Sequence, residues 1–163
     1  AIVTPLLELV KDPDQHVRIN AIKALARHPA LSFDPAFHAL RDATPLQRLL
    51  YIDLIVRMKN AAIPYLTQAL SLDDWMLANK AAELLWKIGG AAVVPVLCQG
   101  LQITQVRKTC IVALGSLGGK ESVPFLKEIE QVAATKHLVK WALKKTADKK
   151  IIYKTPRGWA ARS

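Results

Sequence analysis

The chain has 163 residues, of which 52% are hydrophobic and 22% are charged, a composition that excludes a disordered protein and permits one domain with an apolar core. Its longest apolar run, residues 91–98, falls far short of the roughly 18 residues that a membrane-spanning helix needs. Residues 1–135 hold 14 basic and 12 acidic side chains, whereas residues 136–163 hold nine and one; attraction to an acidic partner should therefore be concentrated near the C-terminus.

The cysteine content and the first residues bear on where the chain comes from. Two cysteines are too few for a disulfide framework, so we expect a cytoplasmic protein. The sequence starts at Ala1 without an initiator Met and almost inside an expected helix. We therefore expect a chain that was processed or cut from a longer one.

Prolines recur at intervals of 29–31 residues, at Pro5, Pro35, Pro64, Pro95 and Pro124. Apolar or small residues follow each proline after two and five positions, a three-residue step that keeps them on one helix face. Proline is tolerated in a first turn because the N–H there has no intrahelical partner. Each proline is therefore predicted to open a short amphipathic helix.

A second helix is predicted after each short one. The expected N-cap residues lie at Asp12–Asp14, Thr44, Ser71–Asp74 and Thr104. Two glycine pairs, Gly89-Gly90 and Gly118-Gly119, are expected to end helices in left-handed turns. The second helices are predicted over residues 16–28, 45–58, 75–88, 105–117 and 136–147.

Equivalent positions of successive units carry similar side chains. One column holds Ala21, Tyr51, Ala81 and Cys110, and another holds Leu25, Ile55, Leu85 and Leu114. A two-helix unit of about 30 residues cannot bury its apolar face alone, but stacked units can. We therefore expect an all-α fold: an α-solenoid of about five antiparallel helix pairs over residues 1–148, followed by an irregular basic arm over residues 149–163.

The run D-x-x-V-R from Asp14 to Arg18, followed by an Ala- and Leu-rich helix, resembles a HEAT repeat, as does Val106-Arg107 followed by CIVALGSLGG. The period is shorter than the roughly 40–47 residues of ordinary HEAT repeats and resembles the short HEAT-like repeats of phycobilin lyases. The resemblance covers residues 1 to about 147; it is weakest in the second unit, where Leu46-Gln47-Arg48 replaces the V-R pair, and in the Lys-rich fifth. It implies a stack whose second helices line a concave surface.

Two series of cations occupy equivalent positions. Arg18, Arg48 and Arg107 form either a basic ladder for an acidic partner or structural links to the loop carboxylates of Asp14 and Asp74, and the structural interpretation is favoured. The second series lies near the ends of the second helices, where cations complement the helix dipole or form one edge of a binding groove. Both interpretations of it stay open; its members are Arg27, Arg57, Lys87 and Lys145.

Trp86 stands where other units carry Ala26, Val56 and Gly115. It either fills a cavity in the core or anchors a partner, and Trp75 lies about three turns away at the start of the same predicted helix. Cys98 has polar equivalents in the other units, which predicts the outer face for its thiol and leaves a reactive or an idle role open.

The last predicted helix and the residues after it differ in character. Lys136, Lys140 and Lys144 form one stripe and Val139, Ala142 and Leu143 another, as expected of a capping unit with a polar outer face. From Lys149 onward, aromatic side chains stand among cations, a mixture that suits nucleic acid, an anionic membrane surface or an acidic protein.

Catalytic motifs are absent from the sequence: it has no metal-ligand spacing of His or Cys and no Gly-rich phosphate loop. No catalytic residue, metal or cofactor is therefore predicted, and we favour a non-enzymatic scaffold, adaptor or assembly factor that grips a partner protein through the concave face and the basic arm. Two alternatives stay open, a subunit similar to the phycobilin lyases and a nucleic-acid-binding HEAT-like protein. The residues predicted to contact the partner are Trp86, Trp75, Arg27, Arg57, Lys87, Lys145, Tyr153, Arg157 and Trp159.

Overall fold

The computed structural model describes residues 3–132 and 134–148. These residues form ten α-helices and two short 3₁₀ helices, and they contain no β-strand. The helices divide between two compact units, one up to Tyr65 and the other from Leu66 onward. Within each unit the helices pack as a helical repeat does, so the all-α prediction is confirmed for the described residues.

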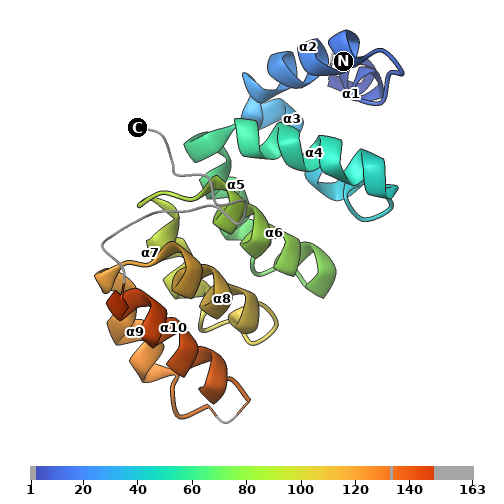
Figure 1. Ribbon diagram of the computed structural model, residues 1–163. Helices are drawn as coiled ribbons and strands as arrows, with labels where there is room; N and C mark the ends of the chain where they lie inside the picture. The colour runs from blue at the N-terminus through green and yellow to red at the C-terminus, as the bar shows by residue number, and fades with distance from the viewer. Residues whose placement is uncertain (1–2, 133, 149–163) are drawn as a thin grey trace. The chain divides into compact units, whose positions relative to one another are not determined.

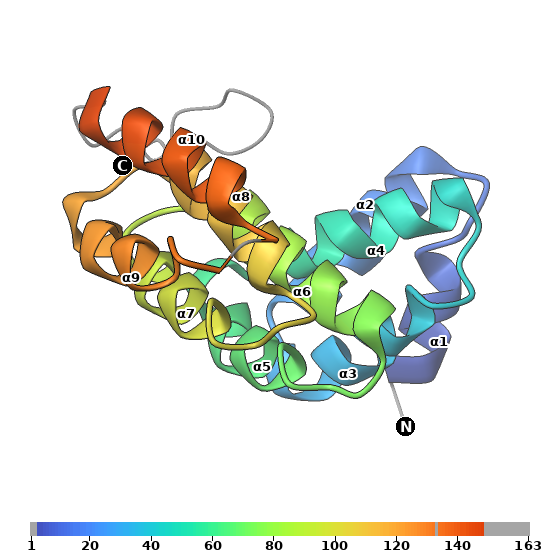
Figure 2. The same cartoon turned by 90° about the horizontal axis from the view of Figure 1, so that it is seen from below.

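The first unit has two layers of helices. α1 packs on α2, α2 packs on α4, and α3 packs on α4, so that α2 and α4 form one layer and α1 and α3 the other (Figures 1 and 2). Leu25 and Ile55 are each at most 1% exposed between the layers. Phe33 stacks on Phe37 and Tyr65 with ring centroids 5.3 and 5.0 Å away, which extends this core along α3. The elements are α1 (Val3–Leu9), α2 (Gln15–Ala26), α3 (Pro29–Ala39), α4 (Pro45–Arg57) and η1 (Lys59–Ala62).

The second unit repeats this arrangement with more helices. α6, α8 and α10 lie side by side in one layer, and α7 packs beneath α6 and α8 while α9 packs beneath α10 (Figure 2). Leu85 and Leu114 are fully buried between the layers. The elements are α5 (Ile63–Ala69), which spans the boundary between the units, α6 (Trp75–Ile88), α7 (Val93–Gly100), α8 (Arg107–Leu117), η2 (Lys120–Ser122), α9 (Val123–Glu128) and α10 (Lys136–Asp148).

The five second helices begin and end within two residues of their predicted bounds, because local signals define them. Asp14 accepts a hydrogen bond from the His16 N–H, and Asp74 caps α6 in the same way. Thr44 and Gln47 form a capping box at the start of α4. The glycine pairs adopt positive φ as predicted, with values of 68° and 83° for the first and 78° and 123° for the second.

Two boundary predictions are wrong. Thr104 does not cap α8: the helix begins at Arg107 with Val106 at the N-cap, because the Ile103 carbonyl accepts from both Val106 and Arg107 N–H groups and tightens the chain into turns there. Pro35 does not open α3, which begins six residues earlier at Pro29. Pro35 lies on an exposed side of the helix, where water can satisfy the carbonyl that the proline leaves without a donor.

The predicted two-sided pattern of the last helix is present in α10. Val139 and Ala142 are fully buried against neighbouring helices, and Leu143 is half-buried. The lysines of the opposite stripe, Lys136, Lys140 and Lys144, are exposed. None of the described helices is both long and apolar enough to cross a membrane.

Candidate functional site

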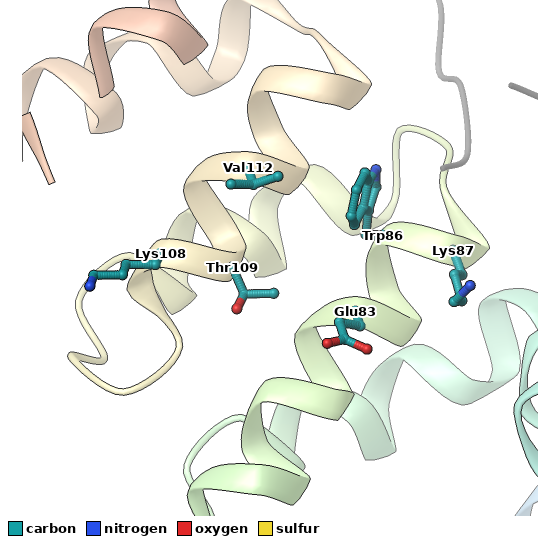
Figure 3. A pocket seen from close by; sticks show the side chains of 6 residues that line it. All are labelled: Glu83, Trp86, Lys87, Lys108, Thr109 and Val112. Atoms are coloured by element: carbon teal, nitrogen blue, oxygen red, sulfur yellow. The ribbon is translucent and has the colours of Figure 1, made fainter. Parts of the chain in front are cut away.

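An open pocket of about 400 Å³ lies between α6 and α8 in the second unit (Figure 3). The two helices pack side by side, and a spacing of three and four residues turns the lining side chains of each helix to one face. The lining residues are Glu83, Trp86 and Lys87 from α6 and Lys108, Thr109 and Val112 from α8.

Trp86 forms the aromatic wall of this pocket. Its side chain, which belongs to α6, is half-buried, and Val112 of the neighbouring α8 also lines the pocket (Figure 3). The indole Nε1 is buried, and none of the described residues accepts a hydrogen bond from it. A ligand in the pocket would therefore contact the ring rather than its N–H.

A polar network fixes α8 against α6 beside the pocket. Thr109 Oγ1 donates to Asn79 Oδ1 over 2.7 Å, and Asn79 Nδ2 donates to the Gln105 carbonyl over 2.9 Å. The Gln105 side chain in turn donates to the Leu72 carbonyl over 2.7 Å. Because these bonds join residues 26 to 33 positions apart, they hold the two pocket walls in a defined register.

The second helices carry most of the positive charge of the helical layers. Between their ends, α2, α4, α6, α8 and α10 hold twelve basic and three acidic residues, whereas the first helices hold one basic and three acidic residues. At the pocket, Glu83 pairs with Lys80, which balances its carboxylate within α6, and Lys108 is exposed. Basic residues therefore outnumber acidic ones four to one on the second helices.

α8 and α10 approach closely at Gly115. A Cβ atom at this position would lie 2.5 Å from Cζ3 of Trp141 and 2.9 Å from Cα of Ala142, distances that no side chain can occupy. The Trp141 ring takes this space and stays 38% exposed. Since Gly115 lies three residues after Val112, one turn of α8 separates the pocket from the second aromatic ring.

The three equivalent arginines bond main-chain carbonyls in the loop before their own helix. Arg18 Nη1 donates to the Asp12 and Pro13 carbonyls, both over 2.8 Å. Arg107 Nε donates to the Leu101 carbonyl over 2.6 Å, and Arg48 Nη2 donates to the Ala43 carbonyl over 3.3 Å. These bonds support the structural interpretation, although the acceptors differ from the carboxylates that the sequence suggested. Each arginine thus satisfies at least one main-chain carbonyl in the connection that leads into its helix.

Residues 2–27 match the HEAT repeat. The match spans α1, α2 and the loop that Arg18 and Asp14 organise, which is the segment where the D-x-x-V-R pattern occurs. No curated protein matches the chain at a significant level. The comparison thus supports the HEAT resemblance for the first helix pair.

Of the six predicted partner-binding residues that the structure describes, two line the pocket, Trp86 and Lys87. Trp75 is 68% exposed at the start of α6, and Lys145 is exposed on α10. In the first unit, Arg27 follows the end of α2 and is exposed, and Arg57 Nε bonds Asp53 Oδ2 over 2.8 Å. The three remaining predicted residues, Tyr153, Arg157 and Trp159, lie outside the described residues.

The prediction that the Cys98 thiol lies on the outer face is wrong, because this residue is buried and only 3% exposed. The 3₁₀ helix η2 packs on α7, the helix that contains Cys98. Alignment of the repeats alone does not reveal this contact. Burial, with a smaller contribution from Glu121, raises the pKa of Cys98 to about 11, and burial raises the pKa of Cys110 to about 12. Both thiols are therefore protonated near neutral pH and are weak nucleophiles.

Four lining residues of the pocket were not singled out by sequence reasoning: Glu83, Lys108, Thr109 and Val112. For Glu83 and Val112 the sequence does contain a signal: together with Trp141 they are spaced 29 residues apart and so share one position of the repeat. Within residues 3–132 and 134–148, no three His, Cys, Asp or Glu side chains are grouped so that they could hold a metal ion.

Proposed function

We propose that this chain is a non-enzymatic HEAT-like scaffold that binds a partner protein through its second helices. The observation that carries the proposal is the pocket between α6 and α8, with a half-buried Trp86 on one wall and exposed Lys108 at its edge. Tryptophan is enriched among the residues that dominate protein–protein binding energy. A HEAT repeat at residues 2–27 agrees with such a role, because repeats of this class commonly serve as interaction scaffolds.

The described thiols are poorly suited to forming a covalent bond with a ligand. Cys98 and Cys110 are buried, and their raised pKa values keep them protonated near neutral pH. Covalent attachment of a ligand through a thiol needs an accessible thiolate. Neither cysteine meets that requirement in the folded protein.

The finer parts of the proposal concern the whole chain. We infer that antiparallel helix pairs over residues 1–148 form one solenoid whose second helices line the binding face. The basic arm, residues 149–163, would add electrostatic attraction to an acidic partner. Its aromatic residues and cations, Tyr153, Arg157 and Trp159, are proposed as a second contact with the same partner.

The test is affinity capture from the native source, followed by direct titration of the purified captured protein. Val112→Glu changes the pocket, and the control Lys127→Glu places a carboxylate outside the pocket, at an exposed position of α9. We expect Val112→Glu to weaken binding about tenfold or more and Lys127→Glu to leave it within about twofold. Equal binding by the wild type and both variants would refute the pocket between α6 and α8 as the binding site.

The charge of the second helices also favours one other candidate, nucleic-acid binding. These helices contain twelve basic residues and three acidic ones. Such binding loses affinity steeply with salt, in proportion to the number of phosphates that the protein neutralises. Titration of a single-stranded and a double-stranded oligonucleotide at two salt concentrations tests it. A steep slope that persists after deletion of residues 149–163 would establish this candidate.

A further inference from the structure

Building on the proposed scaffold function, we propose that the aromatic strip on α6, α8 and α10 binds an extended acidic segment of the partner protein. The aromatic strip consists of Trp86, Val112 and Trp141, one side chain from each of three neighbouring helices. The segment would run across the helices, with apolar side chains on the two rings and carboxylates toward the flanking lysines.

The side chains of the aromatic strip are apolar and partly exposed. Trp86 and Val112 line the pocket between α6 and α8 and are both half-buried. Trp141 lies over Gly115, one turn beyond Val112 on α8, and 38% of its surface is exposed. Two tryptophans that flank a small aliphatic residue are a surface on which apolar side chains of a ligand can be desolvated.

The charges around the aromatic strip favour a negatively charged ligand. α6, α8 and α10 hold eight basic and two acidic residues, and one of the acidic residues, Glu83, already pairs with Lys80. Lys108 lines the pocket and is exposed. Lys144 and Lys145 are exposed three and four positions after Trp141, which places them on the same side of α10. An acidic segment is complementary to this border.

The spacing of the helices sets the length and form of the segment. Neighbouring packed helices lie about 8–10 Å apart, so the outer two of three helices are roughly 16–20 Å apart. An extended chain advances about 3.3 Å per residue and crosses that distance in about six residues. An extended segment also lets alternate side chains point to the aromatic strip, which a shallow surface can accept more readily than a whole helix.

A polypeptide fits this surface better than a nucleic acid does. A phosphate backbone would leave Val112 without an apolar partner. An acidic peptide can place an apolar side chain at Val112 and its carboxylates at Lys108 and Lys144.

The experiment uses the full chain and a fluorescein-labelled acidic peptide of about ten residues, with two phenylalanines at an even spacing of about six positions, which puts both rings on one face of the extended peptide. Two matched peptides replace the acidic residues by glutamine or the phenylalanines by serine, and a labelled oligothymidine of similar length is the fourth probe. Fluorescence anisotropy reports binding to the wild type and to four variants, Val112→Glu, Val112→Gln, Lys108→Glu and Lys108→Gln. Thermal melting of each variant shows whether it is folded.

The expected result is preferential binding of the acidic aromatic peptide, with an affinity that falls as NaCl rises from about 0.05 to 0.5 M. Val112→Glu and Lys108→Glu should each weaken it about tenfold or more, whereas the glutamine variants should lose less than about threefold. The glutamine peptide and the serine peptide should both bind at least tenfold more weakly.

Three outcomes would overturn the inference: equal affinity for the acidic and glutamine peptides, equal loss in the glutamate and glutamine variants, or tighter binding of the oligothymidine. The natural partner separates this failure from that of the proposed function. If Val112→Glu still loses the captured partner while the peptides show no charge preference, the scaffold function stands and only the acidic extended segment is refuted.

Discussion

A Cβ atom at Gly115 would lie 2.5 Å from Cζ3 of Trp141, so α8 and α10 meet at a position that only glycine can occupy. Glycine normally weakens a helix interior by roughly 1 kcal/mol relative to alanine. Here that cost is offset by the close approach of a tryptophan ring and of the Ala142 backbone, whose Cα would be 2.9 Å away from the same atom.

We therefore expect Gly115→Ala to lower the free energy of unfolding by about 1–3 kcal/mol despite its better helix propensity, because overpacking forces α10 away. Urea unfolding followed by circular dichroism measures the change. In a Trp141→Ala background the same substitution should cost less, since the ring is gone and only the Ala142 backbone remains close. An equal cost in both backgrounds would contradict the contact as the cause.

The bond between Thr109 and Asn79 predicts a coupling between α6 and α8. Thr109→Val and Asn79→Leu should each reduce the free energy of unfolding by about 1 kcal/mol, because Thr109 Oγ1 donates to Asn79 Oδ1. The double variant should lose less than the sum by about 0.5–1 kcal/mol, as expected for residues in one network. Strict additivity of the two losses would show that the bond does not contribute to stability.

Ser32 gives a matched test in the first unit. Its hydroxyl is fully buried and lies 2.7 Å from the Leu25 carbonyl and 2.9 Å from the His28 carbonyl, to which it can donate. Ser32→Ala should lower the free energy of unfolding by about 1–2 kcal/mol, because buried carbonyls lose a donor. Ser71 is exposed, and Ser71→Ala should change stability by less than about 0.5 kcal/mol. Similar melting temperatures for the two variants would count against this role of Ser32.

The two buried thiols predict a loss of stability at high pH. Their folded pKa values, about 11 for Cys98 and about 12 for Cys110, lie above the ordinary value of 9.0. Between pH 9 and about 11 the unfolded chain has released protons that the folded chain retains, so the free energy of unfolding falls as pH rises. Urea unfolding at pH 8 and pH 10 measures this effect. The variant with both cysteines replaced by alanine should lose less stability over that interval, and an identical loss would contradict the prediction.

Prediction from sequence succeeded where the signals are local. Asp14, Thr44 and Asp74 mark helix starts through their side-chain oxygens, and the two glycine pairs mark helix ends, so the second helices were found within two residues. These contacts involve groups only a few residues apart, and the sequence displays them directly.

The errors arise where a distant segment or a competing local signal decides the outcome. Pro35 keeps the period of the prolines, but Pro29 stands at a better first-turn position and starts α3 earlier. Cys98 aligns with polar residues, yet η2 folds over α7 and buries it. The Trp141 ring fits against α8 because Gly115, 26 residues before it, has no side chain. This contact can be recognised only once α8 and α10 are packed together.

The arginine bonds have a consequence for how such a chain can change in length. Arg18 and Arg107 each bond carbonyls five or six residues before them, so the donor and the acceptors belong to the same helix pair. Removing or duplicating one pair would carry both members of each bond along and leave no carbonyl stranded at the junction. Gene duplication could therefore lengthen or shorten this protein by whole helix pairs, and a designer could graft one pair onto another array with its loop already stabilised.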